Sequence, residues 1–175
     1  MGSFDLDLKA IARTTQALVY EHLRAGKTTS FVVSTSSMWP TLAPGDKVFI
    51  RAVRAGELRL GDIVIRSLAG AWIAHRLIGR AAPGNEHHLF TKGDNALSAD
   101  DLWQAAQLVG AVVAVERAGQ RKKSVSPARA RWGGVAVALL SRGQLSANRI
   151  SPRIFRRVAV KGLRVCLRIA VRIAL

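Results

Sequence analysis

The middle of the chain consists of short apolar runs rich in β-branched residues, and turn residues separate these runs. This texture predicts strands over residues 28–34, 47–53, 62–67, 71–80, 87–92 and 108–117. Gly45-Asp46 and Gly61-Asp62 each precede such a run. Glycine supplies the positive φ that a tight turn needs, and aspartate can accept hydrogen bonds from nearby backbone amides. We therefore expect a mainly β domain.

Helical spacing occurs on both sides of this region. Before it, residues 5–25 carry apolar side chains near helical spacing with charged residues between them, and Gly26 is placed to end the helix. Such an amphipathic helix can pack on the β domain or lie on a membrane surface. After it, residues 152–175 repeat Lys or Arg every three or four positions in an otherwise aliphatic segment, which on a helix forms one basic stripe.

Charge divides the 175-residue chain into unlike parts. Of the 27 Lys and Arg residues, 15 lie in residues 117–175, a segment that contains no Asp or Glu and so carries nearly all of the net charge of +16. Charge and texture together predict an amphipathic helix over residues 1–27, a β-rich domain over 28–117, and a basic linker with a helical tail over 118–175.

A basic tail attracts polyanions, and its other residues narrow the choice of partner. Trp132 and Phe155 are the only aromatic residues after residue 117, whereas nucleic-acid binders usually add aromatic or base-reading side chains. An anionic membrane surface therefore fits residues 152–175 better than nucleic acid does. The same segment can instead cover an apolar face of the β domain or of a partner.

We expect a cytoplasmic protein that is either soluble or bound peripherally to a membrane through the tail. Acids occupy the N-terminus where a secretory signal would be basic, and no uncharged apolar window is long enough to span a bilayer. Cys166 is the only cysteine, so the chain can form no internal disulfide.

Residues 34–46, Ser-Thr-Ser-Ser-Met-Trp-Pro-Thr-Leu-Ala-Pro-Gly-Asp, place small hydroxyl residues between two predicted strands. Pro40 and Pro44 stiffen this loop, which presents Ser36 and Ser37. A rigid loop that holds a serine is typical of nucleophilic catalysis. It is equally typical of an ordinary turn between strands.

A serine nucleophile needs a base, and His75 is the candidate. It alternates with Ile73 and Leu77 along a predicted strand, so it faces the side that those apolar residues line. It is either a hydrogen-bonded core histidine or a general base. His87 and His88 have the character of solvated residues at a strand edge. Because no second His or Cys stands at a ligand-like offset from His75, we expect no metal site and no cofactor.

Carboxylates that could orient a histidine are concentrated in residues 91–101, Thr-Lys-Gly-Asp-Asn-Ala-Leu-Ser-Ala-Asp-Asp, which contain Asp94, Asp100 and Asp101. This loop can be a turn with helix-capping aspartates. Alternatively, one of the three accepts the other ring proton of His75 and fixes its tautomer.

Three stretches, in this order, resemble the signal peptidase I superfamily, which also includes the self-cleaving repressor-type peptidases. They are Ser-Met-Trp-Pro-Thr-Leu-Ala-Pro-Gly-Asp at 37–46, Gly-Asp-Ile-Val-Ile at 61–65 leading to Ala-His-Arg-Leu-Ile at 74–78, and Lys-Gly-Asp-Asn at 92–95 followed by Asp-Asp at 100–101. The resemblance spans residues 31 to about 117. Many bacterial members have a lysine base where this chain has His75, so the chain is most similar to the archaeal and endoplasmic-reticulum type, which pairs serine with histidine.

The resemblance implies a signal-peptidase-like β fold and a serine endopeptidase activity. Carried over position by position, Ser37 would be the nucleophile and His75 the general base. Asp100 would be the carboxylate that orients the imidazole and completes the relay.

The same resemblance implies supporting roles for three further residues. Asp101 lies one residue from Asp100 and is the alternative orienting carboxylate. Asp94 would hold the Lys-Gly-Asp-Asn box together. Thr35 stands two residues before the nucleophile, where its hydroxyl would help the amide of Ser37 to stabilise the oxyanion.

By resemblance, the substrate is a leader, signal or propeptide that is cleaved after small side chains and bound as an extended strand. The alternative is a non-catalytic basic protein on a peptidase-like scaffold that binds a membrane or a polyanion. Self-cleavage is disfavoured, because the repressor-type relatives generally use lysine as the base. The chain is expected to depart from membrane-bound signal peptidases by its charged amphipathic helix in place of a spanning anchor and by its basic tail.

Overall fold

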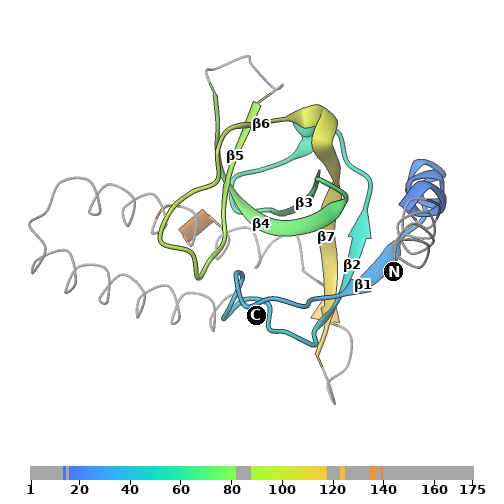
Figure 1. Cartoon of the computed structure of the whole chain (residues 1–175), viewed down its shortest axis with the longest axis horizontal. Coiled ribbons are helices and arrows are strands. Elements are labelled where there is room, and N and C mark those ends of the chain that lie inside the picture. The colour runs from blue at the N-terminus through green and yellow to red at the C-terminus, as the bar shows by residue number, and fades with distance from the viewer. Residues whose placement is uncertain are drawn as a thin grey trace, which may run out of the picture.

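The computed structural model describes residue 14, residues 16–81 and 88–117, and positions 123, 124, 135, 136 and 139. Its strands are β1 (Thr29–Val32), β2 (Lys47–Arg51), β3 (Ile63–Leu68), β4 (Ala71–Arg80), β5 (His88–Lys92), β6 (Trp103–Gln104), β7 (Leu108–Glu116) and β8 (Lys123–Ser124). Two 3₁₀ turns, η1 (Ala55–Glu57) and η2 (Ala105–Gln107), lie between them. The strands form one antiparallel sheet in the order β1-β2-β7-β3-β4-β5-β6, with β8 paired to β7 (Figure 1).

The expectation of a mainly β fold is confirmed. Each of the six predicted runs overlaps a strand, with β3 ending one residue beyond its predicted run, and β6 and β8 are additional. The Gly-Asp turns also form as expected, since Gly45 and Gly61 have φ of 91° and 94°. Asp46 accepts a hydrogen bond from the Ala43 amide at 2.8 Å, and Asp62 accepts one from the Arg59 amide at 2.7 Å.

The sheet bends because its pairing is interrupted at three points. Register shifts occur in the β2–β7 pairing at Phe49/Ile50, in the β3–β7 pairing at Ile65/Arg66 and in the β4–β5 pairing at Leu77/Gly79. Such irregularities bend a strand and increase its twist. Figure 1 shows β4 curving strongly across the middle of the molecule, with β5 on one side and β7 on the other.

Each face of the sheet carries a buried apolar cluster. Alternation along β3 sends Ile63 and Ile65 into one apolar cluster and Val64 into another, because successive side chains of a strand point to opposite faces. The first cluster includes Met38 and Leu42 from the loop between β1 and β2. That loop is therefore anchored in the core on both sides of its first proline.

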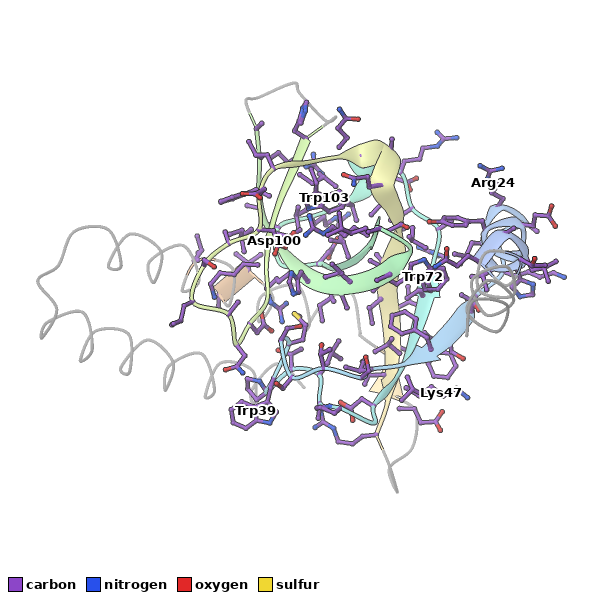
Figure 2. The ribbon with its side chains drawn as sticks, viewed as in Figure 1. Arg24, Trp39, Lys47, Trp72, Asp100 and Trp103 are labelled. Carbon is purple, nitrogen blue, oxygen red and sulfur yellow. The ribbon has the colours of Figure 1, made fainter. Side chains whose placement is uncertain are left out.

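The helix before β1 packs on the sheet, which decides between the two alternatives for its described part. Residues 16–24 are helical, and Gly26, with φ of 74°, follows their end. Leu23 is buried in the first cluster, and Tyr20 packs edge-to-face against Trp72 of β4. Gln16 donates a hydrogen bond to the Gly70 carbonyl at 2.6 Å. Figure 2 shows Trp72 on the side of the sheet nearest this helix.

Several predictions fall on residues outside the described part. They concern the helix before residue 14, His87, Cys166 and the helical tail over 152–175, so the division of the chain into three parts stays a prediction. Within the described residues, no helix has the length and apolarity needed to cross a membrane.

Candidate active site

The loop between β1 and β2 presents Ser37 from a closed frame. Its two ends are tied together, since the Val33 amide donates to the Asp46 carbonyl and the Gly45 amide donates to the Val33 carbonyl, each at 2.8 Å. Met38, next to the serine, is only 1% exposed, whereas Ser37 itself is half-buried. The frame therefore fixes the backbone while leaving the serine accessible. The Oγ1 atom of Thr35 lies 3.4 Å from the Oγ atom of Ser37.

His75, on β4, and Asp100, in the loop before β6, form a hydrogen-bonded pair. The Nδ1 atom of His75 lies 2.7 Å from the Oδ2 atom of Asp100, and both side chains are largely buried, with 13% and 15% exposed. Figure 2 places Asp100 beside the curved part of β4. His75 is thus a partly buried histidine with a hydrogen-bond partner, as either of the two sequence-based interpretations requires.

The ionisation of Asp100 fixes the tautomer of the imidazole. Burial by itself raises the pKa of the Asp100 carboxyl, but hydrogen bonds from His75 and Thr91 and the charge of Arg66 outweigh burial, so its pKa lies below the usual 3.8. The carboxylate is therefore ionised at neutral pH and can only accept hydrogen bonds. It follows that Nδ1 of His75 carries a proton and donates a hydrogen bond to Asp100. In the neutral imidazole this leaves Nε2 as the hydrogen-bond acceptor.

The box at 92–95 joins the serine loop to the imidazole. The Asn95 amide donates to the Ser37 carbonyl at 2.8 Å, and the Asn95 side chain donates to the Ser36 carbonyl at 3.3 Å. A β-carbon on Gly93 would stand 2.7 Å from the Ser37 carbonyl oxygen and 3.1 Å from His75 Nε2. Both atoms therefore border the same small space, which only a glycine leaves open.

Asp94 belongs to a different network from Asp100. Arg76 donates to both of its oxygens, from Nε at 2.8 Å and from Nη2 at 2.7 Å, and the Thr41 hydroxyl also donates to it. The Asp94 side chain is fully buried and that of Arg76 is 5% exposed. A second arginine, Arg117, binds the Thr41 carbonyl at 3.2 Å and Asp46 at 3.0 Å. These contacts fasten the serine loop to β4 and to the end of β7.

The remaining predicted residues lie apart from this cluster. Asp101 is exposed, although it directly follows Asp100. His88 is half-buried at the start of β5 and pairs with Gln104 of β6. In the part of the chain that the structure describes, no group of His, Cys, Asp or Glu side chains could hold a metal ion.

Sequence reasoning missed the residues that surround Asp100. Thr91 of β5 donates to Asp100 Oδ2 at 2.5 Å, and the indole of Trp103 donates to Thr91 Oγ1 at 2.9 Å. Arg66 of β3 places Nη2 3.9 Å from Asp100 Oδ1. The available signal was weak: Thr91 immediately precedes the Lys-Gly-Asp-Asn box, but threonine in a strand is unremarkable.

Comparison with known proteins places this geometry in context. No protein-family model matches the chain. The chain is similar to the signal peptidase complex catalytic subunit sec11 of Neurospora crassa, and the two are 38% identical over 81 residues. The matched region is 43% of this chain and 46% of that protein, so the chain spans about half the length of the curated relative that it matches.

Proposed function

We propose that this chain is a serine endopeptidase of the signal peptidase I superfamily, in the type that pairs serine with histidine. The observation that supports this most is the placement of His75. Its Nδ1 is held by an ionised Asp100, and its Nε2 borders the same space as the Ser37 carbonyl oxygen. A serine, an imidazole in the accepting tautomer and a buried carboxylate are the groups that acyl transfer requires.

The proposed reaction has two halves. The Ser37 Oγ atom attacks the carbonyl carbon of the scissile bond while His75 Nε2 takes the hydroxyl proton, and the tetrahedral intermediate forms. The C–N bond then breaks as the imidazolium gives that proton to the leaving amine, which yields an acyl-enzyme. In the second half, water replaces the amine, His75 again moves the proton, and the peptide acid leaves. Asp100 stabilises the imidazolium in both halves.

The oxyanion needs donors beside the nucleophile. We assign this role to the Ser37 amide, helped by the Thr35 hydroxyl, which lies 3.4 Å from the Ser37 Oγ atom. Asp94 has no part in proton transfer in this scheme. Its bidentate pair with Arg76 holds the box at 92–95, and hence Asn95 and Gly93, against the serine loop.

The substrate is proposed to be a leader, signal or propeptide with small residues before the scissile bond. Two facts support this: the sec11 relative is named as a signal peptidase subunit, and the three sequence stretches resemble peptidases that cleave after small side chains. A quenched fluorescent peptide with an Ala-x-Ala segment is the matching probe.

Alanine substitutions test the mechanism. Ser37→Ala is expected to abolish cleavage of the Ala-x-Ala peptide, and His75→Ala to lower kcat/KM by about a thousandfold. His88→Ala is the matched control, because it removes a histidine from the start of the neighbouring β5, where it pairs with Gln104 of β6, and it should retain the wild-type rate. Cleavage that survives Ser37→Ala would exclude this mechanism.

We also propose that the protein works in the cytoplasm and contacts an anionic membrane through residues 152–175. The support is compositional, since residues 117–175 hold 15 Lys and Arg and no acid. Full-length protein should sediment with phosphatidylserine vesicles at low salt and be released at high salt. Glutamine at each Lys and Arg of residues 152–175 should abolish this sedimentation, and unchanged binding would exclude the tail as the contact.

A further inference from the structure

The hydroxyl of Thr91 has its direction fixed by its neighbours. The indole N–H of Trp103 can only donate, and it lies 2.9 Å from Thr91 Oγ1. The threonine oxygen therefore accepts there, and its own proton points to Asp100 Oδ2 at 2.5 Å. Thr91 is fully buried and Trp103 is 4% exposed, so water does not compete for either group.

One carboxylate oxygen thus receives two donors from different strands. Asp100 Oδ2 accepts from Thr91 of β5 and from His75 of β4, at 2.5 Å and 2.7 Å. The backbone is held as well, because the Asp100 amide donates to the Thr91 carbonyl at 2.9 Å. Thr91 therefore fixes both the position of residue 100 and the orientation of its carboxylate.

The other oxygen of Asp100 faces the guanidinium of Arg66. Arg66 Nη2 lies 3.9 Å from Oδ1, and the guanidinium lies over the Trp103 ring, 5.8 Å from its centre. The Arg66 Nε atom is buried and makes no hydrogen bond to the described residues. His75 and Arg66 are the charged or titratable groups that act on the Asp100 carboxyl.

We propose that Thr91 and Trp103 are positioning residues for the proton relay. The hydrogen bonds from Trp103 to Thr91 and from Thr91 to Asp100 set how tightly Asp100 holds the Nδ1 proton of His75. This inference rests on the proposed peptidase function and extends it to two residues outside the relay itself. A carboxylate that loses a donor is a stronger base, so removing the Thr91 hydroxyl makes Asp100 hold the imidazole proton more tightly.

Thr91→Val removes the donor at nearly constant volume, and kinetics should reveal its loss. We expect kcat to fall by about tenfold with KM unchanged, since one hydrogen bond to a charged group is lost. The acidic limb of the pH profile of kcat/KM should move by about 0.5 toward higher pH. A purely structural defect would lower the rate equally at every pH.

Three variants sharpen this test. Thr91→Ser keeps the hydroxyl and should restore most of the rate and the pH profile. Trp103→Phe removes the N–H that directs Thr91, together with part of the ring that lies under Arg66, and should shift the profile in the same direction by a smaller amount. Thr29→Val makes the same chemical change at the start of β1, away from Asp100, and should have no effect. A Thr91→Val profile that superimposes on that of the wild type would overturn the proposal.

A spectroscopic arm does not depend on peptide cleavage. In a Ser37→Ala background with ¹⁵N-labelled histidine, the Nδ1 proton of His75 should resonate far downfield because it is bonded to a carboxylate. Adding Thr91→Val should move this resonance further downfield, and Thr91→Ser should move it back. If neither the wild type nor any variant cleaves a peptide, the peptidase proposal fails, but this resonance still tests whether the hydrogen bond from Thr91 acts on Asp100 and His75. If the resonance is the same with and without Thr91→Val, the positioning role is refuted.

Discussion

Replacing Gly93 by alanine is expected to impair the proposed site while the sheet stays folded. The new β-carbon would stand 2.7 Å from the Ser37 carbonyl oxygen, 3.1 Å from His75 Nε2 and 3.4 Å from the Ala96 β-carbon. A separation below 3.0 Å is one that β-carbons essentially never show. The methyl group would therefore push directly between the serine loop and the imidazole.

The size of the effect follows from what has to move. The first obstacle is backbone, and the same carbonyl oxygen accepts the Asn95 amide at 2.8 Å, so it cannot swing away alone. Relief requires a displacement of about 0.8 Å, because non-bonded contacts of carbon are optimal near about 3.5 Å and the new contact is 2.7 Å. Misplacing reacting groups by about 1 Å can cost about a hundredfold in rate. We expect kcat/KM to fall by about ten- to a hundredfold and stability to fall by about 1–3 kcal/mol from overpacking.

The assay combines cleavage of the Ala-x-Ala peptide with urea unfolding of the same protein preparations. Gly70→Ala is the control: Gly70 has φ of 80° and nothing within 4 Å of a β-carbon, in the turn between β3 and β4. Alanine there is strained and should cost about 1 kcal/mol with no loss of rate. A Gly93→Ala protein with the wild-type kcat/KM would refute the close approach of Gly93 to the Ser37 carbonyl oxygen and to His75 Nε2.

Three further predictions concern stability. Asp94→Asn should cost about 3–5 kcal/mol in urea unfolding, because it leaves the 5% exposed Arg76 without its buried counter-charge, and a loss below 1 kcal/mol would contradict the pair. Because the pKa of Asp100 lies below its usual 3.8, its ionised form stabilises the fold above pH 3.8, and this stabilisation is lost as the pH falls through the lowered pKa. Asp100→Asn should therefore make the free energy of unfolding depend less on pH on the acid side. Acid-side profiles of wild type and variant that run parallel would count against this. Leu23→Ala should cost about 2–5 kcal/mol by opening a cavity under the helix, measured by thermal unfolding, and an unchanged melting temperature would mean that the helix does not stabilise the sheet.

Strand positions could be predicted from the sequence because the fold repeats a local signal. Runs of β-branched residues between Gly-Asp turns mark β1, β2, β3, β4, β5 and β7. β6 contains only Trp103 and Gln104, which is too short to show alternation, and its existence depends on pairing with Leu89 of β5. Two-residue strands are a property of the folded sheet rather than of a local pattern.

The site was predictable only in part, because its carboxylates are near one another in the chain. Asp94, Asp100 and Asp101 fall within eight positions, and composition cannot say which of them meets an imidazole on β4. The fold separates them: Asp100 turns in to His75, Asp94 binds Arg76, and Asp101 is exposed. The contacts of Thr91 with Asp100 and Trp103 depend on how β5, β6 and the intervening loop meet, which no local pattern encodes.

The position of β7 in the sheet has a consequence for how the molecule is made. Ser37 belongs to the β1–β2 part, whereas His75 and the loop of Asp100 belong to the part from β3 to β6, and within the described sheet β7 alone pairs with both β2 and β3. β7 follows all of these strands in the chain, so a ribosome delivers it after every other piece of the relay. A nascent chain that has not yet exposed residues 108–116 lacks the strand that pairs with both parts of the sheet. The proposed hydrolytic activity should therefore arise only when synthesis has passed that point.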